Sequence, residues 1–368
     1  MPDGMLAAQF TTDTLPRQVR YDAWRRLISA VFEPTMPNGH ARKDLRAEAS
    51  VAYFGNALVA SATAEAQHFT RSHRLIAAEN LDHYLVQVYR VGVCDGTYGD
   101  VQNKVYPGDI KIIDLARPFH TFNTDFDNIT LTLPRAALAP LLANPDGLHG
   151  TVLHRDTAEA RLLTAHIKEL AASAAKLDTT TGHAVAAATL RLVAACLGPA
   201  THARDKIAPH HAAATSETIR QYIDRNLTSS ELSPDTLTQR FRISRAQLYR
   251  AFPDDGGVQA YIRTQRLRRC FQTIATPAHA KRGIAEIALS FGFVSESHFS
   301  RVFRQAFGLT PSEARAQAAA PPAVRAHSFI NDWMRQLGRD PVTTVWVGQA
   351  GNRIETDRHG GPRIHPLK

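Results

Sequence analysis

The side chains best suited to chemistry in this sequence lie in two short segments rich in arginine. Residues 244–252 read SRAQLYRAF, in which Ser244 can cap a helix while Leu248 and Phe252, four residues apart, must face a core. The opposite face of that helix carries Arg245, Ala246, Tyr249 and Arg250. Arginine is the commonest reader of guanine edges, so this face suits the major groove of double-stranded DNA.

A second segment, residues 295–306, repeats this pattern further along the chain. It reads SESHFSRVFRQA, and Phe299 and Phe303 form the inward stripe of a helix. Its outward side chains are Glu296, Ser297, Ser300, Arg301 and Arg304. Glu296 can accept a hydrogen bond from a cytosine amino group or cap its own helix, and both roles stay open at this point.

Each arginine-rich segment follows a shorter helical pattern and a tight turn. Residues 233–241 begin with a Ser-Pro cap and carry Leu237 and Phe241, and the turn is Arg242-Ile243. In the second unit, residues 284–289 precede a Phe-Gly-Phe turn. Two short helices joined by a tight turn form a helix-turn-helix, and two such units are stronger evidence than one.

A longer helical pattern over residues 259–274 separates the two units. Its apolar stripe is Ile262, Leu267, Phe271 and Ile274, and its length suffices to bridge both units. We expect the three arginines on this segment to form salt bridges or to attract phosphates rather than to read bases; they are Arg266, Arg268 and Arg269.

The net charge is divided unevenly along the 368 residues. The whole chain carries +9, of which +6 falls within residues 216–316 and +3 within residues 317–368, so residues 1–215 are neutral. This asymmetry is expected of a neutral module joined to one that docks on a polyanion.

Residues 1–198 have a different pattern from the basic part. A helix is expected at about 16–32, and short runs of Val, Ile, Tyr and Leu predict strands at 57–61, 84–91, 109–115 and 129–133. Two helical stretches follow, at about 156–172 and 182–197. The strands indicate a β-sandwich or small barrel, and the two helices either complete its core or pair between subunits.

Several function classes are not supported by the sequence. Cys94, Cys196 and Cys270 are too few and too far apart for a disulfide framework or a zinc cluster, which indicates a reducing compartment. We expect no secretory signal and no membrane span, because the most apolar stretch, 184–197, is short and contains Arg191. The sequence has no nucleophile elbow, phosphate loop or dinucleotide fingerprint, so we expect neither enzyme activity nor a cofactor.

The basic part resembles the AraC/XylS family of bacterial transcription regulators. The resemblance is carried by IAEIALSFGFVSESHFSRVFRQAFGLTPSEAR and by SRAQLYRAF, and it covers residues 216–316. It implies a seven-helix domain whose two recognition helices enter successive major-groove faces of one duplex. Ala246 is small where many members carry a larger side chain, and Pro253-Asp254-Asp255 adds acid after the first recognition helix. We therefore expect base reading to depend more on the second unit.

The neutral part resembles the cupin-like effector domain of the same regulators. VYPGDI at 105–110, IID at 112–114 and RPFH at 117–120 are similar to its Pro-Gly-Asp turn and following strands, and PRQVRYDAWRRLISAVF is similar to the leading helix of one branch. The resemblance implies a jelly-roll pocket for a small molecule, followed by helices that pair between subunits. The candidate ligand-binding residues are Tyr84, Tyr89, Arg90 and His120.

Many cupins bind a metal through a His-x-His pair, a Glu and a later His. His120 lies near the place of the later His, but His68, His73 and His83 have the wrong spacing for the pair. We therefore expect no metal site.

The fold class predicted from these observations is a multi-domain chain with an N-terminal cupin-like β jelly roll plus helical hairpin and a C-terminal all-α double helix-turn-helix. The predicted division is an effector and dimerisation domain at 1–198, a linker at 199–215, a DNA-binding domain at 216–316 with units at 233–252 and 283–306, and an extension at 317–368 that packs on the DNA-binding domain.

The predicted function is a sequence-specific activator in the bacterial cytoplasm, associated with the nucleoid. The expected partners are promoter DNA, RNA polymerase, a small-molecule effector and a second copy of the chain. The alternatives are a ligand-independent dimeric regulator and a cupin-type metalloprotein.

Overall fold

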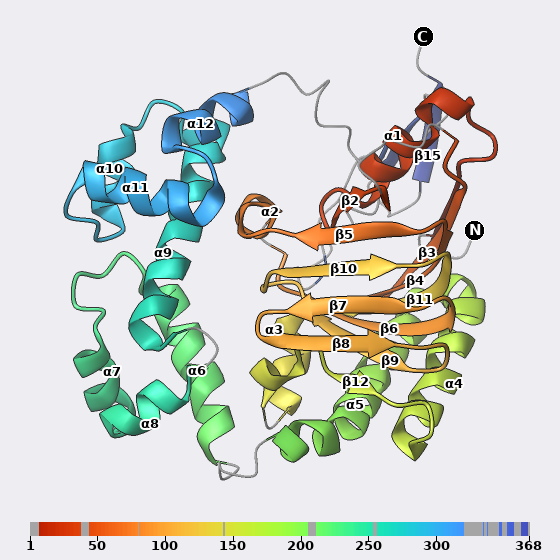
Figure 1. The fold of residues 1–368 in the computed structure, drawn as a ribbon, viewed down its shortest axis with the longest axis horizontal. Helices are drawn as coiled ribbons and strands as arrows, with labels where there is room; N and C mark the ends of the chain where they lie inside the picture. Colours follow the sequence, from red (N-terminus) through yellow and green to blue (C-terminus); the bar gives the residue numbers. More distant parts are fainter. Residues whose placement is uncertain are drawn as a thin grey trace.

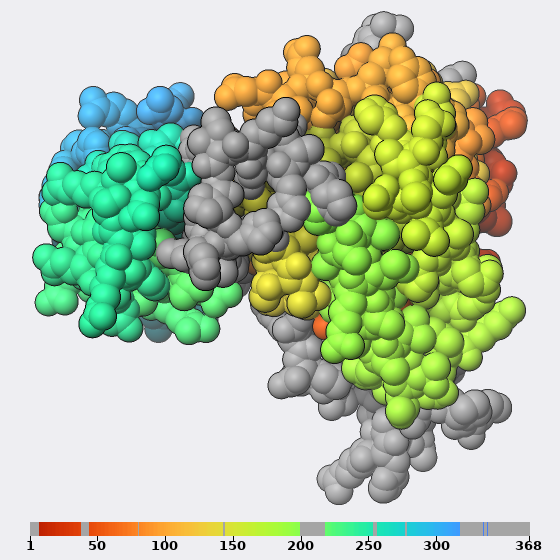
Figure 2. All heavy atoms as spheres, turned by 90° about the horizontal axis from the view of Figure 1, so that it is seen from below, coloured from red at the N-terminus to blue at the C-terminus, as the bar shows by residue number. Residues whose placement is uncertain are grey.

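The computed structural model describes residues 7–37, 44–79, 81–142, 144–204, 211–252, 256–319, 334, 337, 346–347, 352–356 and 362–366. Figure 1 shows a strand-rich unit beside a purely helical one. Figure 2 shows the same two units as neighbouring lobes. The expected order, strands first and helix-turn-helix units last, is confirmed.

The strand-rich unit consists of two antiparallel sheets packed face to face. One sheet has the strand order β1-β3-β4-β11-β6-β9-β12 and the other β2-β5-β10-β7-β8. The strands of the first sheet are β1 (Ala7–Thr11), β3 (Ala47–Phe54), β4 (Ala57–Ala64), β11 (Phe126–Leu133), β6 (Tyr84–Val91), β9 (Ile110–Asp114) and β12 (Val152–Leu153). Those of the second are β2 (Glu33–Thr35), β5 (Gln67–Arg71), β10 (Phe119–Asn123), β7 (Cys94–Tyr98) and β8 (Val101–Val105).

Two of the helices in this unit cover the outer face of the larger sheet (Figure 1). They are α4 (Ala158–Ser173) and α5 (Thr179–Arg204), and their buried side chains join those of β6, β9 and β11 in one core. The shorter helices are α1 (Arg17–Ile28), α2 (His73–Glu79) and α3 (Arg135–Leu138). Of the two roles left open for the helical hairpin, completing the domain's own core is thus confirmed.

Part of α5 resembles a membrane span in its composition. Thr179–Gly198 is long and apolar enough to cross a bilayer, and 39% of that window is buried inside the protein. The apolar stretch expected from the sequence, 184–197, is shorter than the helix itself, which begins at Thr179 and continues to Arg204. Leu190, Val193 and Leu197 are buried in the core that α5 shares with the larger sheet.

The helical unit contains two helix-turn-helix pairs joined by one long helix. α7 (Pro234–Phe241) and α8 (Arg245–Arg250) form the first pair, and α10 (Ile284–Ser290) and α11 (Glu296–Phe307) form the second. α9 (Val258–Ala275) connects them, α6 (His211–Arg225) precedes them and α12 (Pro311–Ala319) follows. α5 and α6 extend into the range predicted for the linker, because they take in residues 199–204 and 211–215.

α9 contributes to the cores of both pairs. Val258 and Ile262 pack with Leu248 of the first pair. Leu267 and Phe271 pack with the second pair. All four residues of the predicted stripe are buried, so the two pairs share one rigid support.

The C-terminal extension packs against a different domain from the one predicted. Met334 and Leu337 are buried among Ala30, Val31 and Leu81 of the strand-rich unit. The His83 ring and the Met334 carbonyl are 2.6 Å apart. Beyond them, β13 (Trp346–Val347), β14 (Asn352–Thr356) and β15 (Pro362–Pro366) form a small sheet in that order. The expectation that the extension packs on the DNA-binding domain is therefore wrong for its described core residues.

A buried arginine ties several loops of the strand-rich unit together. The Arg71 guanidinium has no exposed surface and donates to the carbonyl oxygens of Leu115 (2.7 Å), Val31 (2.8 Å), Ala30 (2.9 Å) and Leu81 (3.2 Å). Burial lowers its pKa to about 9. One side chain thus satisfies the backbone between α1 and β2, before β6 and after β9.

We predict that Arg71→Met destabilises the chain by about 3–5 kcal/mol, because methionine fills the space but leaves four buried carbonyls without a donor. Urea unfolding followed by circular dichroism measures the change. Arg74→Met is the matched control, because Arg74 forms an exposed pair with Glu33 (3.1 Å) and such pairs contribute at most about 1 kcal/mol. Equal losses in the two variants would contradict the assigned role of Arg71.

Candidate DNA interface and effector cavity

The first recognition helix, α8, is fixed at its start by reciprocal hydrogen bonds. The Ser244 hydroxyl accepts from the Gln247 backbone N–H (3.1 Å), and the Gln247 side chain accepts from the Ser244 backbone N–H (2.8 Å). Arg242 adopts a left-handed conformation (φ 53°) at the end of α7, which makes the turn tight. The cap and turn expected from the sequence are thus present.

The predicted side chains of α8 all face solvent, since Arg245, Ala246, Tyr249 and Arg250 are exposed while Leu248 is buried. Arg245 forms an ion pair with Asp235 of α7 (2.5 Å). Both side chains are largely exposed, and such pairs are weak enough to be exchanged for a DNA contact.

The second recognition helix, α11, is longer and more firmly packed. Ser295 caps its first turn through the His298 backbone N–H (3.4 Å), and Gly308 ends it in a left-handed conformation (φ 73°). Phe299, Phe303 and Phe307 are buried. Glu296 was left open between a capping and a base-reading role; Ser295 provides the capping oxygen, which leaves the Glu296 carboxylate exposed in the first turn.

The predicted face of α11 is also accessible. Glu296, Ser297, Arg301 and Arg304 are exposed, and Ser300 is half-buried beside the core. His298 and Gln305 are exposed on the same helix and were not singled out from the sequence. Residues 253–255, where acid was expected after α8, lie outside the described residues.

The three arginines of α9 each contact other residues of the protein. Arg266 donates to the carbonyls of Leu227 and Ser229 (3.0 Å each), which holds the loop after α6. Arg268 donates to the Ala116 carbonyl of the strand-rich unit (2.7 Å). Arg269 contacts Gln272 (3.4 Å). Arg266 and Arg268 each bind backbone oxygens, which positions the elements that they join, and attraction of phosphate by the three arginines stays a prediction.

A cavity of about 110 Å³ lies between the two sheets of the strand-rich unit. Much of its wall is apolar and aromatic, including Trp24, Phe32, Phe69, Phe119 and Phe126. Polar side chains enter it from the strands, and they include Gln87, Tyr89, Lys111, Asn123 and Asn128. The expected jelly-roll pocket is therefore present as a space of small-molecule size.

Of the four candidate ligand residues, Tyr89 lines this cavity and the other three do not. Tyr84 and Arg90 lie an odd number of residues from Tyr89 on β6, so their side chains emerge on the opposite face of the sheet. Tyr84 donates to the Pro145 carbonyl (3.2 Å), and Arg90 pairs with Asp127 (2.5 Å). His120 is exposed and lies 2.8 Å from the Thr70 hydroxyl. Strand phase therefore favours Tyr89 among the four candidates for this cavity and leaves the other three out of its wall.

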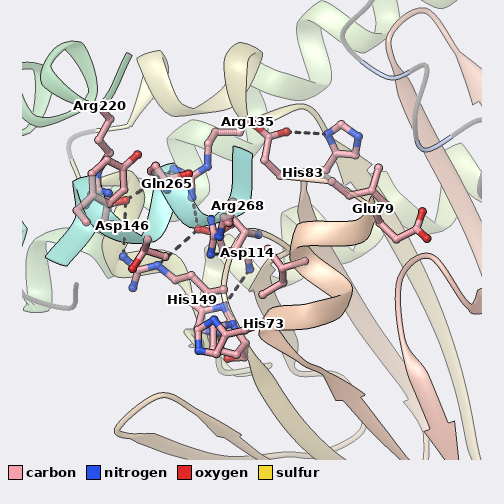
Figure 3. Close-up of a pocket in the computed structure, with 18 of the residues that line it drawn as sticks. His73, Glu79, His83, Asp114, Arg135, Asp146, His149, Arg220, Gln265 and Arg268 are labelled. Atoms are coloured by element: carbon pink, nitrogen blue, oxygen red, sulfur yellow. Dashed lines mark hydrogen bonds and ion pairs between the residues drawn. The ribbon is translucent and has the colours of Figure 1, made fainter. Parts of the chain in front are cut away.

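A larger hollow of about 730 Å³ lies between the strand-rich and helical units (Figure 3). Asp146 pairs there with Arg220 of α6 (2.8 Å) and more distantly with Arg117 (3.8 Å). The guanidinium of Arg220 also lies 4.5 Å and 4.4 Å from the ring centroids of Phe252 and Tyr261. Arg220 therefore belongs to the core of the first helix-turn-helix pair and to the contact between units, a role that spacing alone could not show.

Asp114 lies in the same hollow and is fully buried. Burial alone would raise its pKa, but the pairing with Arg135 and Arg117 lowers the pKa below its usual value. Among the described residues, no group of three or more His, Cys, Asp or Glu side chains has the arrangement of a metal site.

His149 is held as a neutral ring in this network. Its Nδ1 accepts from the Asp114 backbone N–H (3.1 Å), and its Nε2 lies 3.2 Å from the Pro118 carbonyl. Burial lowers its pKa to about 4. The unfolded chain binds this proton more readily than the folded chain, so the stabilisation is complete above pH 6.5 and is lost as the pH falls from 6.5 to 4.

We predict that His149→Gln flattens the fall in stability between pH 6.5 and pH 4 by up to about 3 kcal/mol in total, because glutamine keeps an acceptor and a donor but does not titrate there. Denaturant unfolding at half-unit pH intervals measures this slope. Identical slopes for the two proteins would show that His149 does not control the acid sensitivity.

Comparisons with known proteins agree with the two-part organisation. A family model described as a helix-turn-helix domain matches residues 237–317, and one described as an AraC-binding-like domain matches residues 24–198. Transcriptional activator NphR of Rhodococcus sp is 24% identical over 274 residues, which are 72% of this chain and 79% of that protein. The XylDLEGF operon transcriptional activator of Pseudomonas putida is 32% identical over 103 residues, which are 27% of this chain and 32% of that protein.

Among solved structures, the AraC-like transcriptional activator CuxR is similar to this chain. It is 25% identical and has a TM-score of 0.49, and the match covers 72% of this chain and 94% of that one.

Proposed function

The chain belongs to the AraC/XylS family of transcription regulators, and we propose that it activates transcription by reading DNA with α8 and α11 under the control of a small molecule bound in its strand-rich domain. The observation that carries the proposal is the pair of capped helices with exposed arginines on one rigid support, α9. Arginine side chains on such helices suit guanine edges in a major groove.

We assign DNA contact to the exposed faces of the two recognition helices. On α8 these residues are Arg245, Ala246, Tyr249 and Arg250, and on α11 they are Glu296, Ser297, Ser300, Arg301 and Arg304. We expect α11 to contribute more specificity, because α8 is half its length and Arg245 must first leave Asp235. The net charge of +6 over residues 216–316 adds attraction for phosphate along the duplex.

The remaining assignments concern organisation and partners. We propose an effector domain at 1–198, a connection at 199–215 and a DNA-binding domain at 216–316, in a chain that acts in the bacterial cytoplasm as a homodimer and recruits RNA polymerase. The inner faces of α4 and α5 are buried, so dimerisation would use their outer faces, where Leu162 is 61% exposed. An effector would shift the dimer between arrangements only if it binds one of them more tightly.

Selection of genomic fragments with the purified full chain, at two salt concentrations, tests the DNA-reading function. We predict a shared motif whose half-sites lie about one helical turn apart, because α9 holds α8 and α11 at a fixed spacing, and we predict that it persists at the higher salt. Recovery of unrelated fragments that disappear with salt would instead indicate phosphate attraction alone.

We predict that Arg301→Ala weakens binding to the selected site by about 1–3 kcal/mol and changes binding to random DNA much less, if this side chain reads a base. Fluorescence anisotropy with both duplexes measures the two affinities. Arg26→Ala removes the same charge from an exposed position of α1 and should leave both unchanged. An equal loss on both duplexes would make Arg301 a phosphate contact.

A further inference from the structure

Among the described residues that line the cavity between the sheets, Lys111 is the charged one, and it is 2% exposed. It lies on β9 between isoleucines, opposite Gln87 of β6. Strand alternation places Lys111 and Ile113 on the cavity side, while Ile110 and Ile112 enter the core beneath α4 and α5.

The groups closest to the Lys111 Nζ are a phenol hydroxyl and a cysteine sulfur. Its Nζ lies 3.2 Å from the Tyr89 hydroxyl and 3.2 Å from the Cys94 sulfur, and the Tyr89 hydroxyl donates to Asn123 (2.9 Å). The ammonium is also 5.2 Å from the centre of the Tyr89 ring. Within the described part of the chain, no Asp or Glu oxygen lies within ion-pair distance of it.

A buried cation without a counter-charge is costly, so proteins pair such groups or use them to bind an anion. The rest of the cavity wall indicates what kind of anion would fit, because Lys111 lines the same space as Trp24, Phe69, Phe119 and Phe126. A volume of about 110 Å³ is of the order of cavities that hold one benzene-sized molecule. The site therefore combines one positive group with an apolar, largely aromatic chamber.

We propose that this cavity binds a small monocarboxylate with an apolar body, and that the carboxylate pairs with Lys111. Tyr89 and Asn123 would hold the ammonium in place, and the aromatic wall would enclose the hydrocarbon part of the ligand. The inference rests on the proposed role of the strand-rich domain as the effector domain, and it deepens that role by naming the chemical class of the effector.

Thermal unfolding of the full chain with paired probes tests this proposal. The probes are hexanoate, benzoate, phenylacetate and cinnamate, each compared with its neutral amide. A ligand that binds the native state raises Tm, so at least one acid should raise it while its amide does not. Equal shifts for acid and amide, shifts by amides alone, or no shift with any of the four acids would each overturn the proposal.

Lys111→Met tests the assigned residue, because methionine has a similar volume and no charge. We expect the affinity for the active acid, measured by calorimetry, to fall roughly 10- to 100-fold. This loss corresponds to the free energy of one charge-assisted hydrogen bond. Lys104→Met is the matched control, since Lys104 is exposed on β8 and outside the cavity wall, and it should bind the acid as the wild type does. Unchanged affinity in Lys111→Met would overturn the assignment.

Two measurements separate loss of the ligand site from loss of the fold or of DNA binding. The acid and amide comparison uses the wild-type chain, so it holds even if Lys111→Met does not fold. DNA binding by ligand-free Lys111→Met to the selected fragments should match the wild type. Loss of acid binding with DNA binding retained would support the ligand assignment, and failure of both acids and DNA would count against the regulator function itself.

Discussion

The packing of α9 against two separate cores is the constraint on which the reading of DNA depends. Its first half is built into the core of α7 and α8, and its second half into that of α10 and α11. Because both cores are close-packed, neither recognition helix can change its distance from the other without disrupting α9. The chain thus holds its two recognition helices at a fixed spacing, so any regulation must act on the DNA-binding domain as a whole.

The contact between the strand-rich and helical units also involves α9. Arg268 of α9 donates to Ala116, and Arg220 of α6 pairs with Asp146 while it lies against the rings of Phe252 and Tyr261. The strand-rich unit therefore contacts α9 and, through α2, the buried side of α11. A shift in the strand-rich unit would move both recognition helices together as one body.

Most of the fold was predictable because the helix caps and apolar stripes that indicate it lie within short stretches of the sequence. Ser233 and Ser244 each cap the helix that they were expected to cap, and the stripe from Ile262 to Ile274 is buried as its period indicated. The cavity residues were harder to predict, since Tyr84 and Arg90 were chosen by residue type without regard to strand phase. Phase alone would have favoured Lys111, because it alternates with buried isoleucines on β9.

The contacts between distant segments were not predictable from local patterns. Arg220 and Asp146 are 74 residues apart, and nothing in either neighbourhood indicates the other. Met334 is a further case, because it belongs to the C-terminal extension and yet lines the cavity of the N-terminal domain. Met334 is synthesised after every strand of the two large sheets, so a chain that ends before this residue would contain both sheets but lack that part of the cavity wall.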